Sequence, residues 1–234
     1  MKFNPIPFNR STTRLRPDTM DLSKYDSPGS QQLLGSCTGD AVIALYENLL
    51  NQKGPEYSVR LSRLWVWYYA RKSIGLENTT YGTHTKEAVK ALASYGVCLE
   101  KDWSYIESNA TIVPLGGITA KGKPYEISKI YSHPDTESVL DRITLGYPVV
   151  ITTNTGIRGS NHAMLAIGYK DKGSILLVKD SNRDENASFY KRIPVSSIIE
   201  GDSWSFDLLD PPVVNKWLKY RVVRFLIWLR DTVF

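Results

Sequence analysis

The chain has 234 residues, of which 42% are hydrophobic and 23% charged, a composition ordinary for a globular protein with one large core. Two cysteines, Cys37 and Cys98, are too few for a disulfide framework or a four-cysteine zinc site. The first residues lack the apolar core of a signal peptide, and no apolar run is long enough to span a membrane. We therefore expect a cytoplasmic protein with two free thiols, with one disulfide between the two cysteines as the alternative.

The net charge of +5 is concentrated at the C-terminal end of the chain. Residues 213–234 contain five basic side chains against one aspartate, which leaves a charge of +1 for residues 1–212. Those residues contain no basic stripe and no nucleic-acid-binding motif, so no nucleic-acid partner is expected.

The first part of the chain is predicted to be mainly helical. Residues 1–30 are polar and rich in Pro, Ser, Thr and Asp, and are expected to form an extended arm. Apolar residues then recur with helical spacing from about 38 to 51, an aromatic-rich helix is expected at 62–75, and a third at 85–95 with Gly96 as its C-terminal stop.

The pattern changes near residue 124, after which strand-like segments predominate. We expect strands within 125–133, 147–155, 188–194 and 203–209, a hairpin across 162–180, and one short helix at 135–146 with Asp135 as its N-cap. A helical first part followed by a β-rich second part predicts an α+β protein with two lobes.

Cys37 begins the first predicted helix, within "QQLLGSCTGD". A helix N-terminus favours the thiolate, which is the reactive form of the side chain, so Cys37 is a candidate nucleophile. The alternative is a cysteine that only contributes to packing, which is also the simplest interpretation of Cys98.

A nucleophilic cysteine needs a base, and the chain has three histidines. His162 stands at the head of an apolar strand, where a rigid element would hold it in position. His84 lies in a turn and His133 in a loop, and both are expected at the surface. The second strand of the hairpin ends in "LLVKDSN", so antiparallel pairing would bring Asp180 beside His162 to orient its imidazole. A solvated turn residue is the alternative for Asp180.

The segments "GSCT", "HAMLAIGY" and "LLVKDSN", in this order, resemble the papain-like cysteine peptidases, and most of all their intracellular bacterial and phage members. The likeness covers about residues 21–210 and includes "GTHTKEAVKALASYGVCLEKDWSY" and "IIEGDSWSFDLL". It implies a papain-like two-lobed α+β fold, with a helical N-terminal lobe at 31–123, an antiparallel β-rich C-terminal lobe at 124–210, and the active-site cleft between them. The arm at 1–30 precedes this peptidase domain, and a further segment at 211–234 follows it.

The resemblance implies a role for each catalytic candidate. Cys37 matches the nucleophile, His162 the acid–base partner, and Asp180 the residue that orients the histidine. Gln31 matches the glutamine whose side-chain amide helps to form the oxyanion hole, with the Cys37 backbone N–H as the other donor. Gln32 is the alternative if the register differs by one. No cofactor and no metal ion is implied.

The substrate-binding candidates and two departures from the family pattern come from the same resemblance. Gly82 matches a glycine that pairs with extended substrate backbone, with a plain turn as the alternative, and Asn161 is the second substrate-binding candidate. Asp180 stands where the family usually has Asn, and Asn182 stands where a shielding tryptophan is common. We therefore expect a wetter contact between His162 and Asp180.

The segment 213–234 is predicted to form a basic amphipathic helix, because Leu218, Val222, Phe225 and Leu229 share one face. It would dock on the protein's own domain, associate with another copy or a protein partner, or lie on a membrane surface.

Together these residues predict a cysteine endopeptidase that hydrolyses peptide bonds through a Cys-His-Asp triad, with a peptide or protein as its substrate. A related thiol acyl-transfer enzyme, such as an amidase, deamidase or transglutaminase, would use the same groups. An inactive papain-like module of a larger, phage-type assembly is the third interpretation, and would locate the protein in a phage particle.

Overall fold

The computed structural model describes residues 3–9, 15–28, 34–114, 125–155, 160–182 and 188–209. This part of the chain contains four α-helices and an eight-stranded sheet. In chain order the elements are β1 (Ile6–Pro7), β2 (Met20–Asp21), α1 (Cys37–Lys53), α2 (Arg63–Lys72), α3 (Thr85–Tyr95), β3 (Ile127–His133), α5 (Thr136–Thr144), β4 (Val149–Thr153), β5 (His162–Lys170), β6 (Ile175–Lys179), β7 (Tyr190–Pro194) and β8 (Ser203–Leu208). The expected C-terminal helix at 213–234 lies outside the described residues.

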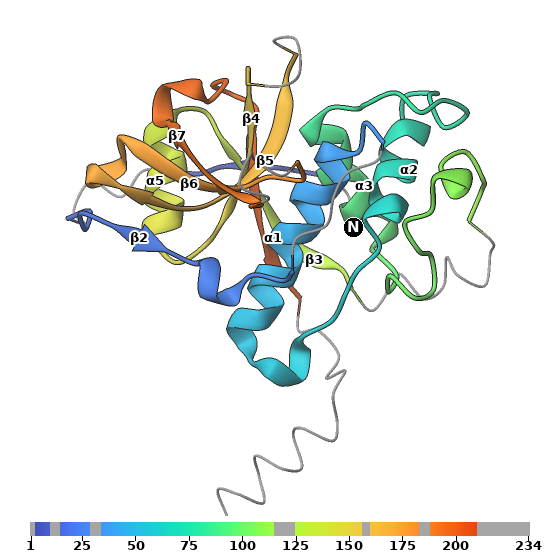
Figure 1. The fold of residues 1–234 in the computed structure, drawn as a ribbon, viewed down its shortest axis with the longest axis horizontal. Coiled ribbons are helices and arrows are strands. Elements are labelled where there is room, and N and C mark those ends of the chain that lie inside the picture. Colours follow the sequence, from blue (N-terminus) through green and yellow to red (C-terminus); the bar gives the residue numbers. More distant parts are fainter. Residues whose placement is uncertain are drawn as a thin grey trace, which may run out of the picture.

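The helices α1, α2 and α3 gather on one side of the molecule (Figure 1). Ser62 caps α2, where its hydroxyl accepts a hydrogen bond from the Trp65 backbone N–H at 3.2 Å. Gly39 allows α1 and α2 to pack closely, because a Cβ at this position would lie 2.7 Å from the Arg63 carbonyl oxygen. The aromatic side chains of α2, including Trp65 and Trp67, are fully buried in the resulting core.

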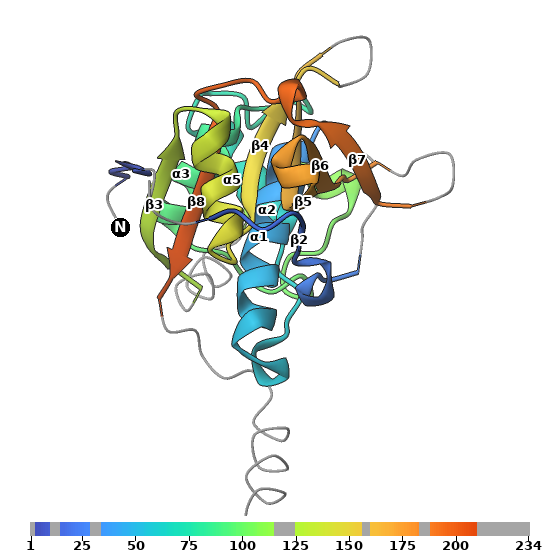
Figure 2. The ribbon, with the colours of Figure 1, turned by 90° about the vertical axis from the view of Figure 1, so that its left-hand side faces the viewer.

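The sheet has the strand order β1-β3-β8-β4-β5-β6-β7, and β2 pairs separately with β5. Successive side chains of β4 and β5 point to opposite faces, and both faces are covered. Val150 and Leu165 pack into the core that contains α1, whereas Ile151 and Met164 pack into a second core beneath α5. Figure 2 views the sheet from the side that α5 covers.

The α+β fold class predicted from the sequence is confirmed. The predicted N-cap is also observed, since the Asp135 carboxylate accepts a hydrogen bond from the Ser138 backbone N–H at 2.7 Å. Among the helices of the described ranges, none combines the length and the apolar character that a bilayer span requires.

The expected surface position of His133 is wrong. His133 is the last residue of β3 and is only 1% exposed, with its ring 2.9 Å from the Ser205 hydroxyl and 3.2 Å from the Ser138 carbonyl oxygen. Proline after it ends the strand instead of placing the histidine in a loop. Burial, with a further contribution from the positive charge of Arg142, lowers the pKa of His133 to about 4.

The N-terminal arm is built into the sheet at two places. β1 pairs with β3 in parallel, and β2 pairs with β5 antiparallel, with Met20 opposite Tyr169. Gly168 is required at this crossing, because a Cβ there would overlap the Met20 carbonyl group. Leu22 follows directly and is buried in the core beside α1.

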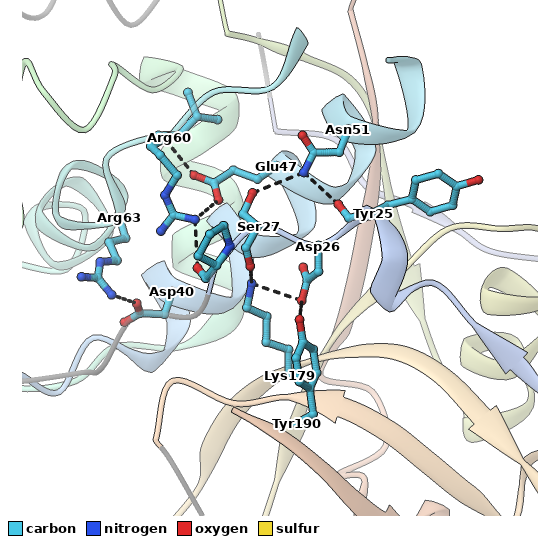
Figure 3. A network of polar contacts seen from close by, with 12 residues as sticks. Tyr25, Asp26, Ser27, Asp40, Glu47, Asn51, Arg60, Arg63, Lys179 and Tyr190 are labelled. Carbon is cyan, nitrogen blue, oxygen red and sulfur yellow. Dashed lines mark hydrogen bonds and ion pairs between the residues drawn. The ribbon is translucent and has the colours of Figure 1, made fainter. Parts of the chain in front are cut away.

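A network of polar contacts fixes residues 25–28 of the arm (Figure 3). The buried Lys179 ammonium donates to the Ser27 carbonyl oxygen at 2.7 Å and lies 3.2 Å from the Asp26 carboxylate. Asn51 of α1 donates to the Tyr25 carbonyl oxygen at 2.8 Å, and Arg60 to the Pro28 carbonyl oxygen at 3.0 Å. The arm is therefore held by side chains from both the helices and the sheet.

Candidate active site

Cys37 is the first residue of α1 and is half-buried. As the first residue of the helix, it has a backbone N–H without an acceptor inside the helix. The preceding turn is fixed from two sides. The Ser36 hydroxyl donates to the Asp40 carboxylate at 2.8 Å, and the Tyr105 hydroxyl lies 2.8 Å from the same Ser36 oxygen and accepts from the Leu34 N–H at 3.1 Å. The nucleophile candidate therefore stands on a rigid helix start.

Gly82 lies against the turn that precedes Cys37. A Cβ on Gly35 would come within 3.2 Å of the Gly82 backbone nitrogen, so the two chain segments lie in close contact at Gly35. The Trp67 indole fixes Gly35 by donating to its carbonyl oxygen at 3.0 Å. Gly82 itself is exposed, close to Cys37, where extended substrate backbone would find it. Its substrate-binding role stays a prediction.

His162 and Asp180 are brought together by the hairpin of β5 and β6. Leu165 pairs with Lys179, so the residue after Lys179 lies near the beginning of β5, where His162 stands. The His162 Nε2 and Asp180 Oδ1 atoms are 2.6 Å apart, and the residues are 8% and 5% exposed. Cys37 and His162 line the same pocket, and the Cys37 side chain contributes to the raised pKa of the imidazole.

These contacts raise the pKa of His162 to about 9. Burial is the largest single influence and acts in the opposite direction, but the hydrogen bonds and charges of Asp180 and Cys37 together outweigh it. The imidazole is therefore protonated at neutral pH, which is the state a thiolate partner requires.

Asp180 has a third partner that the sequence patterns did not reveal. Lys191 of β7 donates to the Asp180 Oδ2 atom at 2.6 Å, while the Asn182 backbone N–H donates to Oδ1 at 2.9 Å. Burial raises the pKa of Asp180, but His162, Lys191 and the Asn182 N–H together hold it below its ordinary value. The expected wetter contact is therefore wrong, because the lysine and the surrounding strands leave Asp180 only 5% exposed.

Lys191 belongs to the strand-like segment "SFYKRIP", so its position in a strand can be predicted from the sequence. In the structure Lys191 pairs with Val178, two positions before Asp180. β6 ends at Lys179 and β7 begins at Tyr190, a separation in sequence that allows several registers, so the sequence pattern alone could not select this one.

A small pocket, open to solvent, adjoins Cys37 and His162. Its other lining residues come from the start of α1, the start of α3 and the residues before it, β4, the start of β5 and the residue before it, and the turn before β8: Thr38, Thr83, His84, Thr85, Thr152, Asn161, Ala163 and Asp202. Asn161, a substrate-binding candidate, is thus part of the wall. His84 is exposed as expected, but stands at this pocket.

The expected oxyanion donor cannot be placed. Gln31 and Gln32, the candidates for the side-chain donor, lie outside the described residues. Within the ranges that are described, no group of three or more His, Cys, Asp or Glu side chains is arranged to hold a metal ion.

Comparison with known proteins gives one matching family model, described as the Peptidase_C39 like family, over residues 77–205, more than half of the chain. A curated relative, an uncharacterized peptidase C1-like protein of Acanthamoeba polyphaga mimivirus, is 22% identical in an alignment of length 231 that covers 84% of this chain and 73% of the relative.

Several solved structures have the same fold. Xylellain, a cysteine protease from Xylella fastidiosa, superposes with a TM-score of 0.72 at 21% identity, covering 89% of this chain and 91% of xylellain. Digestive procathepsin L 3 of Tenebrio molitor gives 0.67 at 18% identity over 87% and 74% of the two chains. The bromelain protease of Ananas comosus, solved with the E64 inhibitor, gives 0.64 at 20% identity over 82% and 100%. The chain therefore belongs to the Peptidase_C39 like family and has the fold of the papain-like cysteine proteases.

Proposed function

We propose that the protein is a cysteine endopeptidase in which Cys37 is the nucleophile, His162 the acid–base catalyst and Asp180 the residue that orients the histidine. The observation that carries this proposal is that Cys37 and His162 line one pocket, while the His162 imidazole is hydrogen-bonded to the buried Asp180 carboxylate at 2.6 Å. Membership of a peptidase family and the papain-like fold support the same reaction class.

In the proposed reaction, Cys37 and His162 form a thiolate–imidazolium pair, and the sulfur attacks a peptide carbonyl carbon. The oxyanion that forms accepts a hydrogen bond from the Cys37 backbone N–H at the start of α1. The resemblance to papain-like peptidases assigns the second donor to Gln31. His162 transfers its proton to the leaving amine, and a water molecule then gives its proton to His162 as it hydrolyses the thioester. The second product is a carboxylic acid, which releases its proton to solvent and becomes a carboxylate, and the thiolate–imidazolium pair is restored.

The two other interpretations are weaker. A related acyl-transfer enzyme would use the same three groups. It would differ from a peptidase only in the amide that it attacks or in the acceptor of the acyl group. An inactive binding module has no requirement for a buried His162–Asp180 pair, which is costly to bury unless it is used or fully compensated. The retained contacts therefore favour a working enzyme.

The test is active-site labelling with an E64-type epoxide, followed by mass spectrometry of the intact protein and of its peptides. The wild-type protein should take up one label, on Cys37, and should cleave members of a peptide library. Cys37→Ala and His162→Ala should take up none, whereas Cys98→Ala should still be labelled, because Cys98 is fully buried away from the site. Absence of labelling in the wild type would overturn the proposal, and labelling without cleavage would favour another acyl transfer.

A further inference from the structure

The pocket beside Cys37 and His162 is lined in part by polar residues. Thr83, Thr85, Thr152 and Asn161 are among them. Hydroxyl and amide groups lose water when a ligand enters such a pocket, and a polar or charged group of the ligand returns hydrogen bonds to them.

Asp202 contributes a carboxylate to this pocket, in a fixed orientation. Its Oδ1 atom accepts hydrogen bonds from the Thr85 hydroxyl at 2.5 Å and from the Trp204 indole at 3.0 Å. Thr85 is buried in the first turn of α3, and its hydroxyl also lies 3.3 Å from that of Thr152. The carboxylate is thus held by groups of the scaffold.

Both hydrogen-bond donors to Asp202 are neutral, which distinguishes it from other carboxylates near the site. Asp180 pairs with Lys191 at 2.6 Å and Asp40 with Arg63 at 2.9 Å. Among the described residues, the ion pairs include none with Asp202, and the pocket wall contains no lysine or arginine. His162 also lines the pocket, but its charge is directed to Cys37 and Asp180. The negative charge of Asp202 is therefore available to a ligand.

We infer that Asp202 selects a basic side chain, lysine or arginine, in the substrate residue that occupies this pocket next to the scissile bond. This inference rests on the proposed peptidase function and names its substrate class. An ammonium or guanidinium group would form a charge-assisted hydrogen bond with the carboxylate and bury its aliphatic stem along the pocket wall.

The first experiment is a fluorogenic peptide library in which each position near the scissile bond is varied in turn. One position should select Lys and Arg over neutral residues. Replacing that residue by citrulline or homocitrulline, the uncharged analogues, should reduce kcat/KM roughly 10- to 100-fold, the effect of losing one charged hydrogen bond. This comparison uses the unmodified protein, so it does not depend on the folding of a variant.

The second experiment compares Asp202→Asn with Glu200→Gln, a matched removal of an exposed carboxylate two residues away that does not line the pocket. Asp202→Asn should reduce the preference for basic substrates, measured as the ratio of kcat/KM for basic to uncharged substrates, by the same factor as the uncharged analogues do. Glu200→Gln should leave this ratio unchanged. Epoxide labelling of Cys37 counts the active molecules in each sample. Cleavage without a preference for basic residues, or a preference that survives Asp202→Asn, would overturn the inference and leave the proposed function intact. Failure of both labelling and cleavage in the wild type would instead reject the function itself.

Discussion

Lys191 donates to the Asp180 carboxylate at 2.6 Å, through the oxygen atom that His162 does not use. Asp180 therefore faces a cation on each side, and the histidine faces an ion pair instead of an isolated negative charge. Where papain-like peptidases usually have a neutral Asn, this chain has a carboxylate whose charge is balanced by the neighbouring strand. The charge balance around His162 is thus set by β6 and β7 together.

Lys191→Met should shift the alkaline limb of the pH profile to higher pH. Loss of the ammonium group leaves the charge of Asp180 uncompensated, which stabilises the imidazolium and raises the pKa of His162 further above its present value of about 9. The alkaline limb of kcat/KM reports deprotonation of this group. Lys191→Arg retains the charge and is the control. A shift toward lower pH in Lys191→Met would contradict this description.

Asp180→Asn should have the opposite effect. An amide can still accept the imidazole hydrogen bond but carries no charge, so the pKa of His162 should fall toward its ordinary value and the alkaline limb should move to lower pH. Activity at alkaline pH should therefore decline more than activity near pH 6. An unchanged profile would mean that the charge of Asp180 has no influence on His162.

Acid should destabilise the fold through His133. The folded-state pKa of about 4 lies below the unfolded value near 6.5, so the unfolded chain binds more protons between these values. Stability is complete above about pH 6.5 and is lost as the pH falls toward 4, by about 3 kcal/mol at most. Urea unfolding at pH 7 and at pH 4.5 measures the difference. His133→Asn should reduce it, and equal acid sensitivity in this variant would assign the effect to other groups.

Lys179→Met should destabilise the protein by roughly 3–5 kcal/mol, because it leaves the Asp26 carboxylate buried without its cation. The double substitution Lys179→Met with Asp26→Asn should recover much of the loss, since it removes the buried charge as well. Urea unfolding of the two single variants and the double variant gives the coupling energy between the two residues. Additive losses would show that the two side chains act independently.

The sequence predicted the parts of this structure that depend on local pattern. Apolar periodicity located α1, α2 and α3, and the hairpin pattern brought His162 and Asp180 into register, because both depend on residues close in the chain. It failed for His133, since burial of a polar residue depends on α5 covering the end of β3. Lys191 and Asp202 were missed for a related reason. Their roles arise from the pairing of β7 with β6 and from the packing of the turn before β8 on α3, which no local pattern records.

The pairing of β2 with β5, and of the arm with Lys179, has a consequence for the order in which the protein becomes active during synthesis. The helices can form as they leave the ribosome. Met20 and Ser27 can contact Tyr169 and Lys179 only after these residues, about 150 positions later in the chain, have been synthesised. The same late hairpin carries His162 and Asp180. An incomplete chain therefore contains Cys37 without His162, and under the proposed mechanism the thiol gains its base when the hairpin forms and the N-terminal arm can pair with it.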